Sequence, residues 1–175
     1  MPFKSRIRTV PHYPKPGVMF RDITTLLKDA TGLQLAVKSL ADHFRGHLID
    51  RVAGIEARGF ILGAAVAYEL GLGFIPVRKK GKLPAKTIGQ DYALEYGTDR
   101  IELHADAISP GESILLIDDL IATGGTAAAA CALIQGMGGN IQGCGFVINL
   151  PDLGGRQQLE EQGISVFALC EFEGD

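Results

Sequence analysis

One stretch constrains the fold of this chain more than any other. Four aliphatic residues, Ile114 to Ile117, run directly into two carboxylates, Asp118 and Asp119. An unbroken aliphatic run is typical of a strand buried on both faces, as in a parallel sheet covered by helices. Ligands bind at the carboxyl ends of such strands, whereas two adjacent charges would be costly in a core. We therefore expect an α/β fold with both aspartates at its ligand-binding edge.

A glycine-containing loop follows the carboxylates. Residues 122–126 read Ala-Thr-Gly-Gly-Thr, and the alanine-rich run 127–133 is strongly helix-forming. Glycine lets the backbone turn tightly and point several amides at one spot, while the helix N-terminus adds positive dipole and the threonines add hydroxyl donors. These features predict a phosphate site. It would be formed by Ala122, Thr123, Gly124, Gly125 and Thr126.

The carboxylates and the loop should contact different parts of one ligand. Carboxylates beside a phosphate would repel it, so we expect Asp118 and Asp119 to face the hydroxyl groups of a sugar diol. A ribose 5-phosphate has this layout. The alternative is a nucleoside triphosphatase in which an aspartate at a strand end holds magnesium. Such enzymes need a companion G-x-x-x-x-G-K-[ST] loop, which the sequence does not contain.

Composition narrows the class of protein. The chain has 175 residues, 46% hydrophobic and 21% charged, which predicts one globular domain over residues 1–175. A net charge of −3 gives no basis for general binding to nucleic acid or to an anionic membrane. Three cysteines without C-x-x-C spacing indicate reduced thiols and no metal cluster. Without an apolar leader or a long apolar run, we expect a cytoplasmic protein.

Strand-loop-helix units recur along the chain. A strand is predicted at 51–55, a loop at 56–59 and a helix at 60–70, with Gly71 as its C-cap. Further strands are predicted at 73–77, 146–150 and 164–169, and further helices at 33–47 and 156–162. This alternation predicts an open, mainly parallel, twisted sheet flanked by helices.

A cationic segment follows the strand at 73–77. Five cations lie within nine residues, namely Arg78, Lys79, Lys80, Lys82 and Lys86. Such a run is usually a solvated face or a nucleic-acid patch. Here little apolar periodicity follows until a strand at Ile101, and long irregular segments in compact domains are often lids. We therefore expect a flexible lid over about residues 78–104.

The segment from Ile114 to Thr126 resembles the phosphoribosyl pyrophosphate signature of the type I phosphoribosyltransferases. Segments at 12–23, 56–59 and 92–97, and Leu150, resemble bacterial members that use adenine, so the likeness covers nearly the whole chain. The resemblance implies the fold expected above, with a lid or hood. It also implies a purine-salvage transferase that converts adenine and phosphoribosyl pyrophosphate to AMP and diphosphate.

The resemblance places the base pocket on an N-terminal arm, at about residues 1–30. Pro14, Pro16 and Gly17 keep part of this arm extended and kinked. The aromatic residue of the similar P-x-P-G-x-x-F-R-D segment stacks on the purine, while neighbouring backbone groups bond its edge. The positions that match are Phe20 for stacking, Met19 and Arg21 for backbone contacts, and Leu150 for the other side of the base.

The resemblance also implies roles for charged residues. Arg58, in the loop that receives diphosphate, would add charge-assisted hydrogen bonds, and Arg78, Lys79 and Lys82 would bind substrate from the lid. Glu95 would protonate or hydrogen-bond the base at N7.

Tyr96, next to Glu95, would help to close the site. The alternative for this part of the lid is a β-ribbon in which Tyr92, Leu94 and Tyr96 form one face and Glu95 lies on the solvated face.

The resemblance implies a cationic, oxocarbenium-like transition state, which Asp118 and Asp119 would favour while holding the ribose hydroxyls. Mg²⁺ would arrive mainly on the phosphoribosyl pyrophosphate, with few protein ligands. A homodimer is implied, with Arg78 near the partner's active site. Neither nucleic acid nor membrane is an expected partner.

Two rival functions share the organising stretch. A related enzyme for hypoxanthine, xanthine or orotate would need a different base pocket and lid. A purine-responsive repressor would need an added DNA-binding domain, for which 175 residues leave no room.

Overall fold

The computed structural model describes residues 2–94 and 96–174. Seven strands form one sheet in the order β5-β6-β4-β3-β7-β8-β9, and β1 and β2 form a separate hairpin. The strands are β1 (Arg8–Pro11), β2 (Met19–Asp22), β3 (Arg51–Ile55), β4 (Gly73–Lys79), β5 (Thr87–Ala93), β6 (Thr98–His104), β7 (Ser113–Ile121), β8 (Asn140–Asn149) and β9 (Val166–Glu171). The helices are α1 (Thr24–Lys28), α2 (Ala30–Phe44), α3 (Arg58–Leu70), α4 (Gly125–Gly136) and α5 (Gly155–Glu161), with 3₁₀ turns η1 (Lys4–Arg6) and η2 (Pro151–Leu153).

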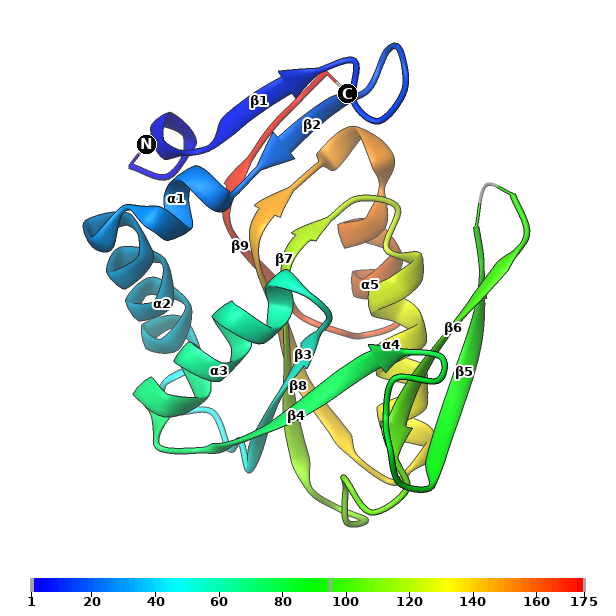
Figure 1. The fold of residues 1–175 in the computed structure, drawn as a ribbon. Coiled ribbons are helices and arrows are strands. Elements are labelled where there is room, and N and C mark those ends of the chain that lie inside the picture. Colours follow the sequence, from blue (N-terminus) through cyan, green and yellow to red (C-terminus); the bar gives the residue numbers. More distant parts are fainter. Residues whose placement is uncertain (1, 95, 175) are drawn as a thin grey trace.

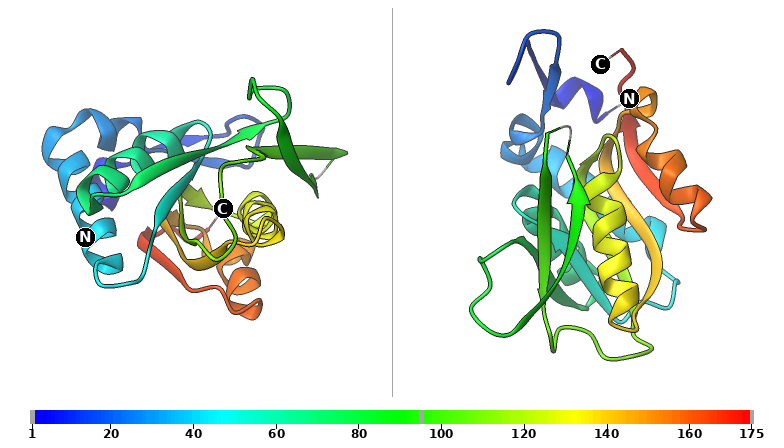
Figure 2. Two further views of the ribbon diagram at one scale, coloured as in Figure 1. Left: turned by 90° about the horizontal axis from the view of Figure 1, so that it is seen from below. Right: turned by 90° about the vertical axis from the view of Figure 1, so that its right-hand side faces the viewer.

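Helices cover both faces of the large sheet. Its strands β4, β3, β7, β8 and β9 are parallel, and the antiparallel pair β5–β6 extends it beyond β4. Helices α2 and α3 lie on one face, and α4 and α5 lie on the other (Figures 1 and 2). The predicted mainly parallel α/β sheet is therefore confirmed.

The central strand β7 has both faces buried, as its aliphatic run predicts. Ile114 and Leu116 pack in the core cluster that contains residues of α4, whereas Leu115 and Ile117 pack in the cluster that contains residues of α2 and α3. All four side chains are fully buried. Alternate residues of a strand point to opposite faces, so this one run builds both cores.

Strand β7 extends further than its aliphatic run. It pairs with β8 as far as Ile121 and Asn149, so Asp118 and Asp119 lie within the strand, near its carboxyl end. The apolar stripe that starts at residue 33 belongs to helix α2, which begins at Ala30. The Asp29 side chain, a candidate cap in the sequence, accepts a hydrogen bond from the Thr31 amide and caps the helix. The short helix α1 lies in the arm, where the sequence predicted none.

The segment before Ile101 was expected to be irregular, and Thr87–Ala93 instead forms strand β5. Strands β5 and β6 form a regular antiparallel hairpin, with Thr87 opposite His104 and Ala93 opposite Thr98. Several residues of β5 are exposed and the rest are only half-buried, so the strand lacks the apolar alternation that would have predicted it. Tyr92 lies in this ribbon, as the alternative interpretation held, while Leu94 lies beyond the end of β5.

Two further observations concern membrane-spanning helices and the cysteines. No helix in residues 2–94 and 96–174 is long and apolar enough to span a membrane. Cys131, Cys144 and Cys170 are buried free thiols, and the Sγ atoms of Cys131 and Cys144 lie 3.6 Å apart.

Candidate active site

A cavity of about 650 Å³ opens at the carboxyl edge of the parallel sheet. The carboxyl ends of β7 and β8 point toward the β1–β2 hairpin, which lies across this edge (Figure 1). The lining comes from five parts of the chain that are distant in sequence. They are residues 17–21, the β3–α3 turn with Ile55, Glu56 and Arg58, Lys79 at the end of β4, residues 118–127, and Leu150 with Leu153.

The predicted phosphate loop lines the cavity along its full length, from Ala122 to Thr126. Gly124 has φ +84°, a left-handed conformation that glycine adopts without strain, and it is the N-cap of α4. As Gly124 has no side chain to cap the helix, the first amides of α4 are available to a ligand. The twelve-residue helix adds its dipole at the same place. This geometry suits a phosphate group.

Gly155, which the sequence interpretation missed, packs directly against the backbone of the phosphate loop. Its amide donates a hydrogen bond of 3.0 Å to the Ala122 carbonyl. A Cβ atom at residue 155 would come within 2.6 Å of the Gly124 nitrogen, so only glycine fits there. The Gly154-Gly155 pair after the predicted strand at 146–150 was the one available signal.

The two aspartates differ in their surroundings. Asp119 is only 6% exposed and forms an ion pair with Arg58, which also lines the cavity. The Asp118 Oδ1 atom accepts a hydrogen bond of 2.8 Å from the Asp119 amide. Burial, and then the neighbouring Asp119 carboxylate, raises the pKa of Asp118 well above its ordinary value. The pair therefore holds Asp118 toward its neutral form before any ligand binds.

Close approach of α3 contributes to the burial of Asp118. A Cβ atom at Gly59, in the first turn of α3, would lie 2.9 Å from Asp118 Oδ1. Arg58 precedes Gly59 in the same turn, so one helix start both packs on Asp118 and pairs with Asp119. The peptide bond between Glu56 and Ala57, just before this helix, is cis.

Strand β2 brings the predicted base-pocket residues Met19, Phe20 and Arg21 to the cavity. Among the described residues β2 pairs with β1 alone, so its other edge can offer backbone groups to a ligand. The Arg21 side chain points elsewhere, with its guanidinium 4.5 Å from the centre of the Phe172 ring. Tyr13 packs edge-on against Phe20, with ring centroids 5.2 Å apart.

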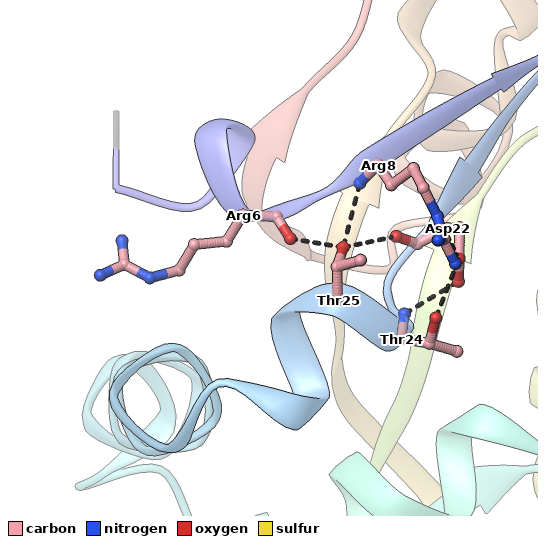
Figure 3. Close-up of polar contacts among 5 residues, drawn as sticks. All are labelled: Arg6, Arg8, Asp22, Thr24 and Thr25. Atoms are coloured by element: carbon pink, nitrogen blue, oxygen red, sulfur yellow. Dashed lines mark hydrogen bonds and ion pairs between the residues drawn. The ribbon is translucent and has the colours of Figure 1, made fainter.

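A polar network anchors the hairpin that carries these residues (Figure 3). The Asp22 carboxylate accepts hydrogen bonds from Arg8 Nε at 3.0 Å, from the Thr24 amide at 2.9 Å and from the Thr24 hydroxyl at 2.8 Å. The Arg8 guanidinium, followed by the Thr24 donors, lowers the pKa of Asp22 to about 2. Thr25 donates to the Arg6 carbonyl at 2.7 Å and accepts from the Arg8 amide at 3.1 Å. The network ties β1 and β2 to the start of α1.

The structure brings only part of the predicted lid to the cavity. Lys79 lines it, but Arg78, Lys82 and Tyr96 do not. Arg78 donates to the Lys82 carbonyl at 3.3 Å and lies 3.7 Å from a Glu56 carboxylate oxygen. Tyr96 is 84% exposed. Glu95 lies outside the described residues.

Other lining residues were missed by sequence reasoning. The Glu56 carboxylate lines the cavity and accepts a hydrogen bond from the Lys79 amide. Val18 and Leu153 add apolar surface to the cavity. Val18 begins the apolar run 18–20 of the resembling segment, which was a signal for it, whereas Leu153 had only its proximity to Leu150.

Comparison with known proteins agrees with this geometry. Residues 25–162 match the family model described as a phosphoribosyl transferase domain. An adenine phosphoribosyltransferase from Nitrosospira multiformis is 66% identical over 175 residues, which is 100% of both chains. The crystal structure of the enzyme of that name from Thermoanaerobacter pseudethanolicus has a TM-score of 0.93 and 45% identity, over 97% of this chain and 98% of that one.

A more distant structure comes from Saccharomyces cerevisiae. This adenine phosphoribosyltransferase, solved with adenine and an imino-altritol bisphosphate, has a TM-score of 0.89 and 36% identity, over 96% of each chain. A domain match over most of the sequence, together with full-length relatives at such identity, shows that the chain belongs to the phosphoribosyltransferase family of enzymes.

Proposed function

We propose that the protein is a purine-salvage enzyme that transfers the phosphoribosyl group of phosphoribosyl pyrophosphate to adenine, giving AMP and diphosphate. The observation that carries the proposal is the lining of the cavity of about 650 Å³, where the phosphate loop, the aspartate pair and the aromatic arm meet. The names of the full-length relatives and the adenine in the yeast structure support the choice of base.

Each part of the two substrates has a matching part of the cavity. The 5-phosphate is assigned to the amides of residues 122–126 at the start of α4. The ribose hydroxyls are assigned to Asp118 and Asp119, which two strand residues, Leu120 and Ile121, separate from the loop. Adenine would lie between Phe20 and Leu150, with the free edge of β2 bonding its polar edge, and diphosphate would lie near Arg58 and Lys79.

In the proposed reaction N9 of adenine forms a bond to C1 of the ribose as the bond from C1 to the diphosphate oxygen breaks, with inversion. The imidazole-ring proton of adenine leaves the base, and the diphosphate or solvent takes it up. The developing charge on the sugar is positive, and the Asp119 carboxylate, which is paired with Arg58, would favour it. Asp118 and Asp119 would also orient the ribose as the bond to diphosphate breaks. A neutral Asp118 can donate a hydrogen bond to one ribose oxygen, while Asp119 accepts from a hydroxyl.

Several parts of the proposal rest on the family resemblance. Glu95 would protonate or hydrogen-bond the base at N7. Tyr96 would close over it, and Arg78 and Lys82 would act in a homodimer, with Arg78 close to the partner's active site. The exposure of Tyr96 in this conformation is compatible with a lid that closes on substrate.

Mg²⁺ is proposed to enter on the phosphoribosyl pyrophosphate. The described residues contain no group of three His, Cys, Asp or Glu side chains placed to hold a metal ion. The hard carboxylate oxygens of Asp118 and Asp119 fit an ion that takes most of its ligands from substrate and water. When bound, Mg²⁺ would neutralise charge on the diphosphate leaving group.

The remaining parts of the proposal concern organisation and location. Residues 1–175 would act as one domain, since the cavity draws on segments from Gly17 to Leu153. A cytoplasmic location fits three free thiols, because that compartment keeps cysteines reduced.

The direct test measures AMP formation from adenine, phosphoribosyl pyrophosphate and Mg²⁺ with the purified chain. Hypoxanthine, xanthine and orotate in place of adenine test the related transferases. Nucleotide formed from one of these bases, and not from adenine, would replace the adenine proposal while keeping phosphoribosyl transfer.

A further inference from the structure

Lys79 is held at the rim of the cavity by two side chains that do not line it. Its Nζ atom donates a hydrogen bond of 2.8 Å to the Tyr92 hydroxyl and forms an ion pair with Asp99. The Tyr92 hydroxyl in turn donates to Asp99 Oδ2 at 3.1 Å. These three residues, the Lys79 cluster, join the end of β4 to both strands of the β5–β6 hairpin.

The backbone of Lys79 is fixed as well. Its amide donates to the Glu56 carboxylate, and Lys79 pairs with Ile101 of β6. The ammonium and the main chain are therefore held separately, which leaves little freedom to a side chain that otherwise has a long flexible stem.

An ammonium group has three N–H donors. Asp99 and Tyr92 take two of those of Lys79, and Lys79 contributes to the cavity wall, so one donor remains for a ligand oxygen. The hydrogen bond from Lys79 lowers the pKa of Asp99. Burial would lower the pKa of Lys79, but Asp99 and Tyr92 more than offset this and raise it. The pair thus stays charged across the neutral range.

We propose that Asp99 and Tyr92 are positioning residues that orient the Lys79 ammonium toward the diphosphate group of the substrate. The proposal deepens the proposed function, on which it rests for the identity of the ligand. Both residues act through Lys79, since neither lines the cavity. Tyr92 also lies against the phosphate loop, because a Cβ atom at Gly125 would be 4.0 Å from its Cδ2 atom. The Lys79 cluster therefore connects the β5–β6 hairpin both to the proposed diphosphate site and to the phosphate loop.

The test compares Asp99→Asn and Tyr92→Phe with wild type, and repeats Asp99→Asn in a Lys79→Met background. The matched control is Asp91→Asn. Asp91 lies on the same hairpin and pairs with Arg100 at 2.9 Å, outside the cavity lining, so this control removes the same charge. These pairs are partly exposed, so their loss should leave the fold intact.

We expect Asp99→Asn to raise the KM for phosphoribosyl pyrophosphate about tenfold. This is the loss of affinity expected when a charge-assisted hydrogen bond to the ligand is no longer well oriented. The KM for adenine should stay within about twofold. Tyr92→Phe should give a smaller change in the same constant. In the Lys79→Met background Asp99→Asn should cause no further loss, because the group that it orients is absent.

Equal losses in both backgrounds, an equal loss in Asp91→Asn, or tighter binding in Asp99→Asn would overturn the proposal. Calorimetric titration with inorganic diphosphate and Mg²⁺ repeats the comparison without turnover. If wild type forms no AMP but the same ranking appears in diphosphate affinity, the proposed function fails and the role of Asp99 stands.

Discussion

Gly155 lies so close to Ala122 that a Cβ atom at residue 155 would come within 2.4 Å of the Ala122 carbonyl oxygen. The contact joins the N-terminus of α5 to the loop between β7 and α4. Because the groups around residue 155 are backbone atoms, they cannot rotate away from a larger side chain. The conformation of the phosphate loop therefore depends on a glycine in another helix.

We expect Gly155→Ala to displace the loop and raise the KM for phosphoribosyl pyrophosphate about tenfold, with a smaller change for adenine. Overpacking of this kind costs about 1–3 kcal/mol, or about 2–12 °C in Tm. Steady-state kinetics and thermal unfolding measure the two effects. Gly136→Ala is the control, since a Cβ atom there has no neighbour within 4 Å among the described residues. Unchanged kinetics in Gly155→Ala would show that the loop tolerates displacement.

The raised pKa of Asp118 predicts that the ionised Asp118 side chain lowers the stability of the fold. A raised pKa means that the folded state favours the neutral carboxyl group. The stability that this group contributes is fully present below the unfolded pKa of about 3.9 and is lost as pH rises through the folded pKa. Asp118→Asn removes the ionisation and keeps an oxygen that accepts from the Asp119 amide. Its Tm should match that of wild type near pH 4 and exceed it increasingly as the pH rises above that value.

Asp22→Asn is the control with the opposite sign. The pKa of Asp22 is lowered to about 2, so its contribution is present above the unfolded pKa and is lost as pH falls through about 2. This variant should be less stable than wild type at neutral pH. Thermal unfolding across the pH range tests both variants, and a Tm gap for Asp118→Asn that does not change with pH would refute the electrostatic explanation.

Asp118→Asn combined with Asp119→Asn should reduce AMP formation by roughly 10² or more, because the stabilisation of a cationic transition state is lost. Circular dichroism and thermal unfolding would confirm that the double variant is folded. Turnover close to that of wild type would rule out the assignment of these side chains to the ribose hydroxyls.

Glu95→Ala should lower kcat by about 10²–10⁴, as for a positioned acid or base, with a smaller effect on KM. Gln90→Ala, in strand β5, is the control for general disturbance of the lid. A variant in which only KM changes would identify Glu95 as a residue of lid closure.

Adenine should be preferred to hypoxanthine and guanine by roughly 10⁴ in kcat/KM, since each unpaired buried polar group costs about 1–3 kcal/mol. The free edge of β2 offers backbone donors and acceptors whose character is fixed, whereas stacking on Phe20 is nearly indifferent to the edge of the base. The measurement is kcat/KM for the three bases at one Mg²⁺ and phosphoribosyl pyrophosphate concentration. Hypoxanthine within tenfold of adenine would contradict the base assignment.

Local pattern by itself determined the central unit of this protein. A strand buried on both faces must be continuously apolar, and a tight anion-binding turn needs glycine, so residues 114–126 were interpretable without any distant contact. Most of strand β5 was not predicted, because it lacks such a pattern, although the β-ribbon alternative included Tyr92 and a strand was predicted at Ile101. The strand is exposed or half-buried throughout, so no apolar period marks it.

Only the tertiary structure decided which groups meet across the cavity. Arg58 and Asp119 are 61 residues apart, and their pairing depends on how α3 packs beside β7. The support of Ala122 by Gly155, and the orientation of Lys79 by Asp99, likewise come from elements that become neighbours when the sheet forms. Burial raises the pKa of Asp118 and shape limits residue 155 to glycine. Both are properties of surroundings that a linear pattern does not contain.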